Sequence, residues 1–263
     1  MSRKGKNMEV ERYENGVPSW VDLGSPDLAK AKKFYAALFG WNTPEGPPEA
    51  GGYSVADIGG KTVAGLGPKM DPNMPTVWMS YVNVDSVDDT VAKVTANGGT
   101  VLAPPMDVME AGRMAIFADP LGAVIGLWQP NQHTGAQLVN ESGALCWNEL
   151  ITTDLEKSKA FYKAVFGWDG EDQGPPGGPP AYTEWKLAGR SVGGMMPKND
   201  MMPADMPPNW GVYFAVPDTD AAVEKIKELG GSVLVPPTDI EPGRFAVVMD
   251  DQGAPFNVIT MKS

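Results

Sequence analysis

The stretch AKKFYAALFGWN, residues 31–42, returns later in the chain as SKAFYKAVFGWD, residues 158–169. Two further stretches repeat in the same order. They are VTANGGTVLAPPMDV at 94–108, which returns as IKELGGSVLVPPTDI at 226–240, and GRMAIFADPLGA at 112–123, which returns as GRFAVVMDDQGA at 243–254. Ordered self-similarity over such a distance indicates a duplicated structural unit. We therefore predict two homologous halves.

The two halves are predicted to be separate domains, at residues 13–130 and 143–262, joined by a linker at 131–142. The chain has 263 residues, which is long enough for two hydrophobic cores. The linker contains NQHTGAQLVNE, which lacks the hydrophobic periodicity of a helix or a strand.

Each half divides again into a strand, a helix and further strands. In the first module, a short strand at 20–23 precedes a helix that Asp27 can cap and that Gly40 can end. YSVADI and KTVAGL then alternate as strands. The same succession occurs four times. Short strands with amphipathic covering helices predict an α+β fold.

Net charge and composition limit the classes of binding partner that are expected. The net charge is −12 and the basic residues are not clustered, which disfavours nucleic-acid binding. No apolar run reaches the roughly 18 residues of a membrane span, so no membrane partner is expected. A single cysteine, Cys146, and the lack of a visible secretory signal predict a cytoplasmic protein. An acidic surface favours cationic or neutral ligands.

Three motifs together resemble the vicinal oxygen chelate superfamily, which contains glyoxalase I, bleomycin resistance proteins and extradiol dioxygenases. The motifs are D-L-x-x-[AS]-x-x-F-Y-x-x-[LV]-F-G-W at 27–41 and 154–168, G-G-[TS]-V-L at 98–102 and 230–234, and D-P-x-G-A at 119–123. The resemblance spans roughly residues 17–261. It implies tandem glyoxalase-like domains, whose four βαβββ modules form curved mixed sheets around clefts.

The resemblance also implies where a metal would lie. Metal-using members carry His, Gln or Glu on the first and last strands of each module. The matching positions here are Trp20, Gly65, Met79, Gly126, Trp147, Gly194, Gly211 and Asn257. None is a histidine or a carboxylate, and an iron site with two histidines is impossible because His133 is the chain's one histidine. We therefore expect neither a metal nor another cofactor, with a Mg²⁺ site at Asp22 or Glu149 as the open alternative.

Strand alternation places Asp22 and Glu149 on the same faces as Trp20 and Trp147. The predicted catalytic residues are thus Asp22 and Glu149. The predicted ligand-binding residues are Trp20, Trp147, Met79, Tyr81, Tyr213, Trp128 and Asn257. Glycines at the former ligand positions are expected to leave space. The resulting acidic, aromatic-lined pocket suits a planar or cationic molecule. Core packing of the tryptophans and solvated carboxylates are the alternatives.

Other chemically distinctive residues have plainer interpretations. Arg113 and Arg244 follow matching glycines, and surface ion pairs are favoured over anion binding. Cys146 is expected to be a buried structural thiol and not a nucleophile. His133 is expected to be a solvated linker residue. The Pro- and Gly-rich stretch at 170–180 is expected to be a connection.

Three functions follow, and whether the chain is an enzyme stays open among them. The first is metal-independent binding of an aromatic or cationic small molecule. The second is a glyoxalase-like lyase or isomerase, or a hydroxylase, that uses Asp22 or Glu149 as acid or base. The third is an interaction protein with a vestigial cleft. The chain is expected to be a monomer with an internal pseudo-dimer, or a homodimer.

Overall fold

The computed structural model describes residues 9–69, 71–174 and 181–262. The elements of the first half are β1 (Pro18–Ser25), α1 (Leu28–Phe39), η1 (Pro48–Ala50), β2 (Ser54–Ile58), β3 (Lys61–Pro68), β4 (Val77–Asn83), α2 (Val87–Ala96), β5 (Thr100–Val108), β6 (Gly112–Ala118) and β7 (Val124–Pro130).

The second half repeats this succession. Its elements are β8 (Leu145–Thr152), α3 (Leu155–Phe166), β9 (Asp169–Gln173), β10 (Tyr182–Leu187), β11 (Arg190–Pro197), β12 (Asn209–Ala215), α4 (Thr219–Glu228), β13 (Ser232–Ile240), β14 (Gly243–Met249) and β15 (Pro255–Met261). Among the described residues, no helix has the length and apolarity to cross a membrane.

The predicted α+β architecture of four modules is confirmed. The first half forms a seven-stranded sheet in the order β2-β3-β1-β4-β7-β6-β5, and the second an eight-stranded sheet in the order β13-β14-β15-β12-β8-β11-β10-β9. In each sheet, the first strands of two consecutive modules pair antiparallel at the centre, β1 with β4 and β8 with β12. The last strand of each module lies parallel to its first.

The first module has two strands after its helix, whereas each of the other three modules has three. Residues 169–173 form β9 and pair with β10, although the sequence assigned residues 170–180 to a connection. That assignment was therefore wrong at its start, and residues 175–180 lie outside the described part of the chain. The proline and glycine content of the stretch predicted a connection. The strand itself gives no hydrophobic alternation, because it is short, polar and exposed along its whole length.

Helix α1 begins and ends where its capping residues predict. The Asp27 side chain accepts a hydrogen bond from the backbone N–H of Lys30 at 3.1 Å. Gly40 ends the helix with φ of +73°, a left-handed conformation that costs glycine little. Asp154 and Gly167 bound α3 in the same way.

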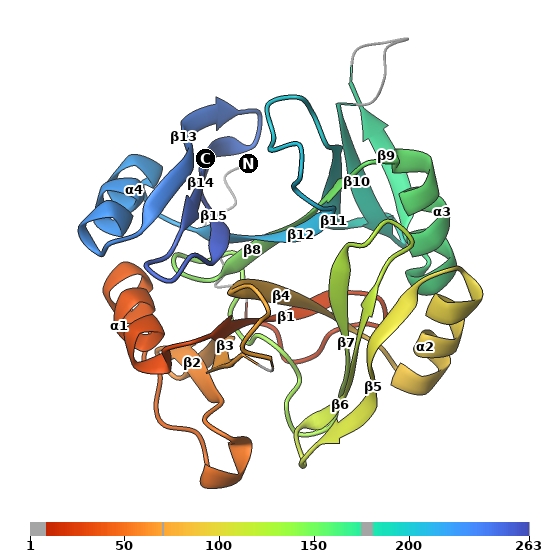
Figure 1. Cartoon of the computed structure of the whole chain (residues 1–263), viewed down its shortest axis with the longest axis horizontal. Coiled ribbons are helices and arrows are strands. Elements are labelled where there is room, and N and C mark those ends of the chain that lie inside the picture. Colours follow the sequence, from red (N-terminus) through yellow and green to blue (C-terminus); the bar gives the residue numbers. More distant parts are fainter. Residues whose placement is uncertain (1–8, 70, 175–180, 263) are drawn as a thin grey trace.

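The two halves share their hydrophobic cores. One core joins Val21 and Leu23 of β1 with Val212 and Phe214 of β12, and it includes residues of both α1 and α4. A second core joins α2 and α3 in the same manner. Figure 1 shows α1 beside α4 and α2 beside α3, with the two curved sheets between them. The sheets therefore pack back to back, and their other faces turn away from each other.

A buried tyrosine crosses each of these cores. The Tyr35 hydroxyl of α1 donates to Asp250 Oδ2 at 3.0 Å and accepts from Trp78 Nε1 at 3.0 Å. In the same arrangement, Tyr162 of α3 donates to Asp119 Oδ2 at 3.0 Å and accepts from Trp210 Nε1 at 2.9 Å. Each helix is thus bonded to the turn before the last strand of the opposite half.

We predict that Tyr35→Phe lowers the free energy of unfolding by about 1–3 kcal/mol, because it leaves Asp250 and the Trp78 indole short of a buried partner. Urea unfolding of Tyr35→Phe, Asp250→Asn and the double variant measures the coupling. Two fully additive losses would contradict a direct interaction between the halves.

Candidate functional site

The outward face of each sheet carries a cluster of polar side chains at its centre. In the first sheet, Asp22 lies opposite Gly65 and Tyr81 lies opposite Gly126. We call this face cup 1. In the second sheet, Glu149 lies opposite Gly194 and Tyr213 lies opposite Asn257, and we call that face cup 2. Both cups have the same plan.

This register corrects the expected ligand positions. The sequence placed the expected metal positions of cup 1 at Trp20, Gly65, Met79 and Gly126, but the residues that lie opposite the two glycines are Asp22 and Tyr81. The central positions are therefore displaced by two residues along the first strands, and the carboxylates are central. This displacement of two residues arises because the capping aspartate indicates where the helix begins. It does not determine which residues of neighbouring strands pair.

Hydrogen bonds join the residues of cup 1 into a chain. Trp20 Nε1 donates to the Tyr53 hydroxyl at 2.9 Å, and that hydroxyl donates to Asp22 Oδ2 at 3.2 Å. Tyr81 also lies beside the Asp22 carboxyl and lowers its pKa. The carboxyl is therefore flanked by two phenols, one of which donates to it directly.

Cup 2 repeats this chain with equivalent residues. Trp147 Nε1 donates to the Tyr182 hydroxyl at 2.8 Å, and the Tyr213 hydroxyl donates to Glu149 Oε1 at 2.8 Å. Tyr182 also bonds to the Glu149 carboxyl. Both cups thus contain the same arrangement of one tryptophan, two tyrosines and one carboxyl.

The carboxyl groups of both cups have raised pKa values. Burial raises the pKa of Asp22 to about 7, against the opposing effect of hydrogen bonds from Tyr53 and Tyr81. Burial also raises the pKa of Glu149, opposed by hydrogen bonds from Tyr213 and Tyr182. A carboxyl that titrates near neutral pH can accept or release a proton there.

Tyr53 and Tyr182 were not among the predicted site residues. Tyr53 lies directly before β2 and Tyr182 begins β10, and each fills the space beside a central glycine. A β-carbon on Gly65 would overlap the Tyr53 hydroxyl, and one on Gly194 would overlap that of Tyr182. The expectation that these glycines leave a roomy pocket was therefore wrong. The repeat offered the missing signal, since YSVADI and YTEWKL both begin with tyrosine.

The donors of the cups do not fit a divalent metal ion. Each cup offers one carboxyl, and its tyrosines have pKa values raised by burial and by the nearby carboxyl, which keeps them neutral. Such an ion needs several converging nitrogen or charged oxygen ligands. Within the described residues, no group of three or more His, Cys, Asp and Glu side chains converges.

The remaining predicted ligand-binding residues lie near these clusters. Met79 and Trp128 pack with Trp20 and Tyr81 on the outward face of the first sheet. Asn257 is buried in cup 2, where its Nδ2 donates to the carbonyl of Val212 at 3.0 Å. The structure thus brings the predicted residues together in two groups.

His133 is not the solvated linker residue that the sequence suggested. Its ring packs edge-on against Trp20, with centroids 4.3 Å apart, and against Trp128 at 5.6 Å. Burial lowers the pKa of His133 to about 4, so its ring is neutral at pH 7. Its Nε2 is buried without a hydrogen-bond partner among the described residues.

The two arginines and the cysteine that the sequence singled out have the structural roles that were expected of them. Arg113 binds Asp88 and Asp107, and Arg244 binds Asp220 and Asp239, all in exposed ion pairs. Burial raises the pKa of Cys146 to about 12, which makes its thiol a poor nucleophile.

Comparison with known proteins shows similarity to one superfamily over most of the chain. A family model described as the glyoxalase/bleomycin resistance protein/dioxygenase superfamily matches residues 18–127 and 144–258. CFP32 of Mycobacterium tuberculosis, which carries a provisional glyoxylase name, is 45% identical over 94% of this chain and 95% of its own. The anthracycline biosynthesis protein DnrV of Streptomyces peucetius is 37% identical over 96% of both chains.

Solved structures show the same fold at low sequence identity. A Mn(II)-bound glyoxalase from Novosphingobium aromaticivorans aligns with a TM-score of 0.64 at 16% identity, over 94% of this chain and 82% of that one. The 2,3-dioxygenase LapB of Pseudomonas sp. KL28 aligns with a TM-score of 0.64 at 14% identity, over 98% and 94%.

The Asp22 environment predicts a pH-dependent stability. An unfolded chain ionises Asp22 near its ordinary pKa of 3.8, whereas the folded chain does so near 7. The free energy of unfolding should therefore fall as pH rises from about 4 to about 7 and should change no further through this group above that range. Asp22→Asn removes this contribution, which is on the order of 4 kcal/mol, because the two pKa values differ by about three and one pKa unit corresponds to about 1.4 kcal/mol.

Urea unfolding of the native chain and Asp22→Asn at pH 5, 6, 7 and 8 measures this difference. The exposed Asp205→Asn variant is the control for loss of a surface charge. A difference between the native chain and Asp22→Asn that stays constant over this pH range would contradict the raised pKa.

Proposed function

Because this chain belongs to the glyoxalase/bleomycin resistance/dioxygenase superfamily, we propose that it binds a small aromatic or cationic molecule in its cups without a metal. The observation that carries the proposal is the duplicated cluster of tryptophan, tyrosine and carboxyl. An indole offers an apolar face for a flat ring, and a carboxyl beside it pairs with a positive charge.

The donor chemistry supports metal independence. A single carboxyl flanked by neutral phenols is a weak ligand set for a divalent ion but a good one for a ligand ammonium group. The relatives named for anthracycline biosynthesis supply a chemical class to test. Anthracyclines join a flat ring system to an amino sugar, and their aglycones lack that cation.

We predict that an anthracycline binds more tightly than its uncharged aglycone, since only the former pairs with a carboxylate. In the double variant Asp22→Asn/Glu149→Gln, affinity for the anthracycline should fall by about tenfold, equivalent to ~1.4 kcal/mol. Affinity for the aglycone should stay the same, which makes the aglycone the matched control. Fluorescence titration of the ligand measures both.

Binding of neither compound would contradict the proposal for this ligand class. It would favour the third function, an interaction protein with a vestigial cleft. Addition of a metal chelator should leave the affinity unchanged, and a loss of binding on chelation would contradict metal independence.

A second function, acid–base catalysis, is favoured by the pKa of about 7 at Asp22. A glyoxalase-like lyase or isomerase needs a group that removes a proton next to a carbonyl, and a hydroxylase can use a general base, so Asp22 or Glu149 would be that base in this second proposal. We predict that any turnover of a 2-oxoaldehyde–thiol adduct rises with pH as the carboxyl ionises. Asp22→Asn/Glu149→Gln should abolish it, and retained turnover would exclude this mechanism.

A further inference from the structure

The two cups share one plan but differ in what lies over their tryptophans. Trp20 of cup 1 is only 3% exposed, whereas Trp147 of cup 2 remains partly exposed. Their own hydrogen bonds do not explain this difference, because each indole donates to the equivalent tyrosine. A neighbouring segment must therefore shield Trp20.

That segment is the linker between the halves. Ala136 is fully buried and packs with Trp20, Tyr81 and Trp128. His133 lies edge-on against Trp20 and Trp128, and the carbonyl of His133 accepts a hydrogen bond from Trp128 Nε1 at 2.8 Å. The linker thus presents an aromatic ring and a methyl group to the outward face of the first sheet.

Several hydrogen bonds hold the linker in this position. The N–H of Ala136 donates to the carbonyl of Ser19 at 2.8 Å, and the carbonyl of Ala136 accepts from the Tyr13 hydroxyl at 2.7 Å. Thr62 Oγ1 donates to the carbonyl of Gly135 at 3.1 Å. Gly135 has φ of +110°, and a β-carbon there would lie 2.6 Å from the Ser19 carbonyl oxygen. This position therefore requires glycine.

The linker also separates cup 1 from a surface cavity. A cavity of about 450 Å³ is lined by linker residues 132–135 and by Met109, Glu110 and Ala111, among others. Trp20 and Asp22 do not line it, although His133 borders it and contacts Trp20. The imidazole therefore stands between the cavity and the cluster of cup 1.

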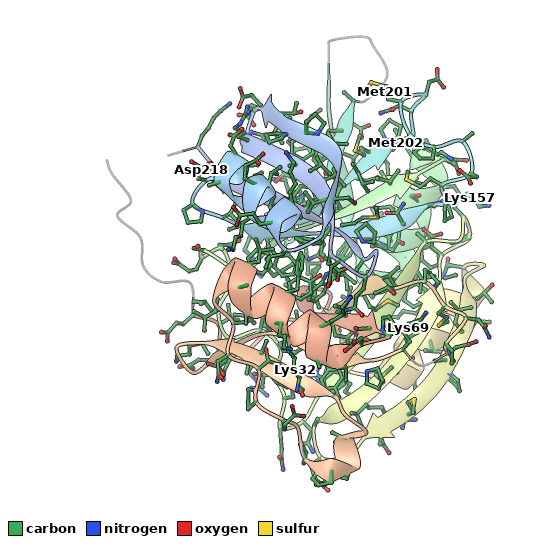
Figure 2. The ribbon with its side chains drawn as sticks, turned by 60° about the vertical axis from the view of Figure 1, so that its left-hand side comes forward. Lys32, Lys69, Lys157, Met201, Met202 and Asp218 are labelled. Carbon is green, nitrogen blue, oxygen red and sulfur yellow. The ribbon has the colours of Figure 1, made fainter. Side chains whose placement is uncertain are left out.

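The loop beside cup 2 is arranged differently. Lys198 Nζ donates to the carbonyls of Ala204 and Met206 at 2.7 Å each, which folds the connection between β11 and β12 onto itself. Figure 2 shows Met201 and Met202 at the outer end of this connection, and Met201 is 92% exposed. Among the described residues, no aromatic ring packs against Trp147 as His133 packs against Trp20.

We propose that residues 131–139 are an intramolecular cap, in which the His133 ring occupies the ligand position over Trp20 and leaves cup 2 as the accessible cup. The imidazole suits this position because a flat neutral ring packs well against an indole edge. The neutral ring also avoids placing a second charge beside the buried Asp22 cluster. For its ligand, this inference rests on the proposed binding function, but the cap can be tested without any ligand.

Hydroxyl-radical footprinting with mass spectrometry tests the cap directly, because it reports the accessibility of each tryptophan. In the native chain, Trp147 should be oxidised severalfold faster than Trp20. His133→Gly should raise the oxidation of Trp20 severalfold and leave Trp147 unchanged. Gln132→Gly, at the adjacent exposed position, is the matched control for an added linker glycine.

Equal oxidation of Trp20 and Trp147 in the native chain would overturn the cap, and this comparison requires no variant to fold. Insensitivity of Trp20 to His133→Gly in a folded variant would overturn the role of the imidazole. Circular dichroism of each variant establishes that it is folded.

Titration with an anthracycline then separates the cap from the proposed function. The native chain should bind one equivalent, which protects Trp147 from oxidation, and His133→Gly should bind two. Two equivalents in the native chain would overturn the cap. Absence of binding in both proteins, with the expected footprint, would uphold the cap and contradict the proposed ligand.

Discussion

The back-to-back packing of the two sheets is the constraint on which the rest of the structure depends. Tyr35 and Tyr162 each cross from a helix of one half to an aspartate of the other, and both hydroxyls are buried. Such bonds fix the relative position of the halves, because a displaced hydroxyl would leave two buried groups unsatisfied. The inner faces are thereby committed to the core, and the outward faces lie outside it.

Much of the fold could be predicted because its signals are local. Asp27 and Gly40 bound α1 through contacts within a few residues, and the duplication predicted the same for α3. Asp22 and Glu149 were predicted to share a face with Trp20 and Trp147 because side chains alternate along a strand. These rules relate residues that are close in the sequence, so a single sequence is enough to apply them.

The rest of the site depends on contacts between distant segments. Tyr53 reaches Asp22 from the position directly before β2, a strand that does not pair with β1, and no periodicity within a strand encodes that approach. The space beside Gly65 could not be predicted for the same reason, since the residue that fills it lies outside the strand. His133 belongs to a segment without regular structure, and its burial follows from bonds to Ser19, Thr62 and Trp128 made by its neighbours and its own backbone.

The shared cores also bear on how such a chain could have arisen. An isolated half would expose the residues that now pack across the interface, including Val21 and Leu23 of β1. Burial of these apolar surfaces requires an equivalent surface from another half. An isolated half would therefore need a second copy to bury them. Because the segment between the halves occurs once in the chain, and its Ala136 and His133 contact the first sheet, the two outward surfaces have unequal surroundings.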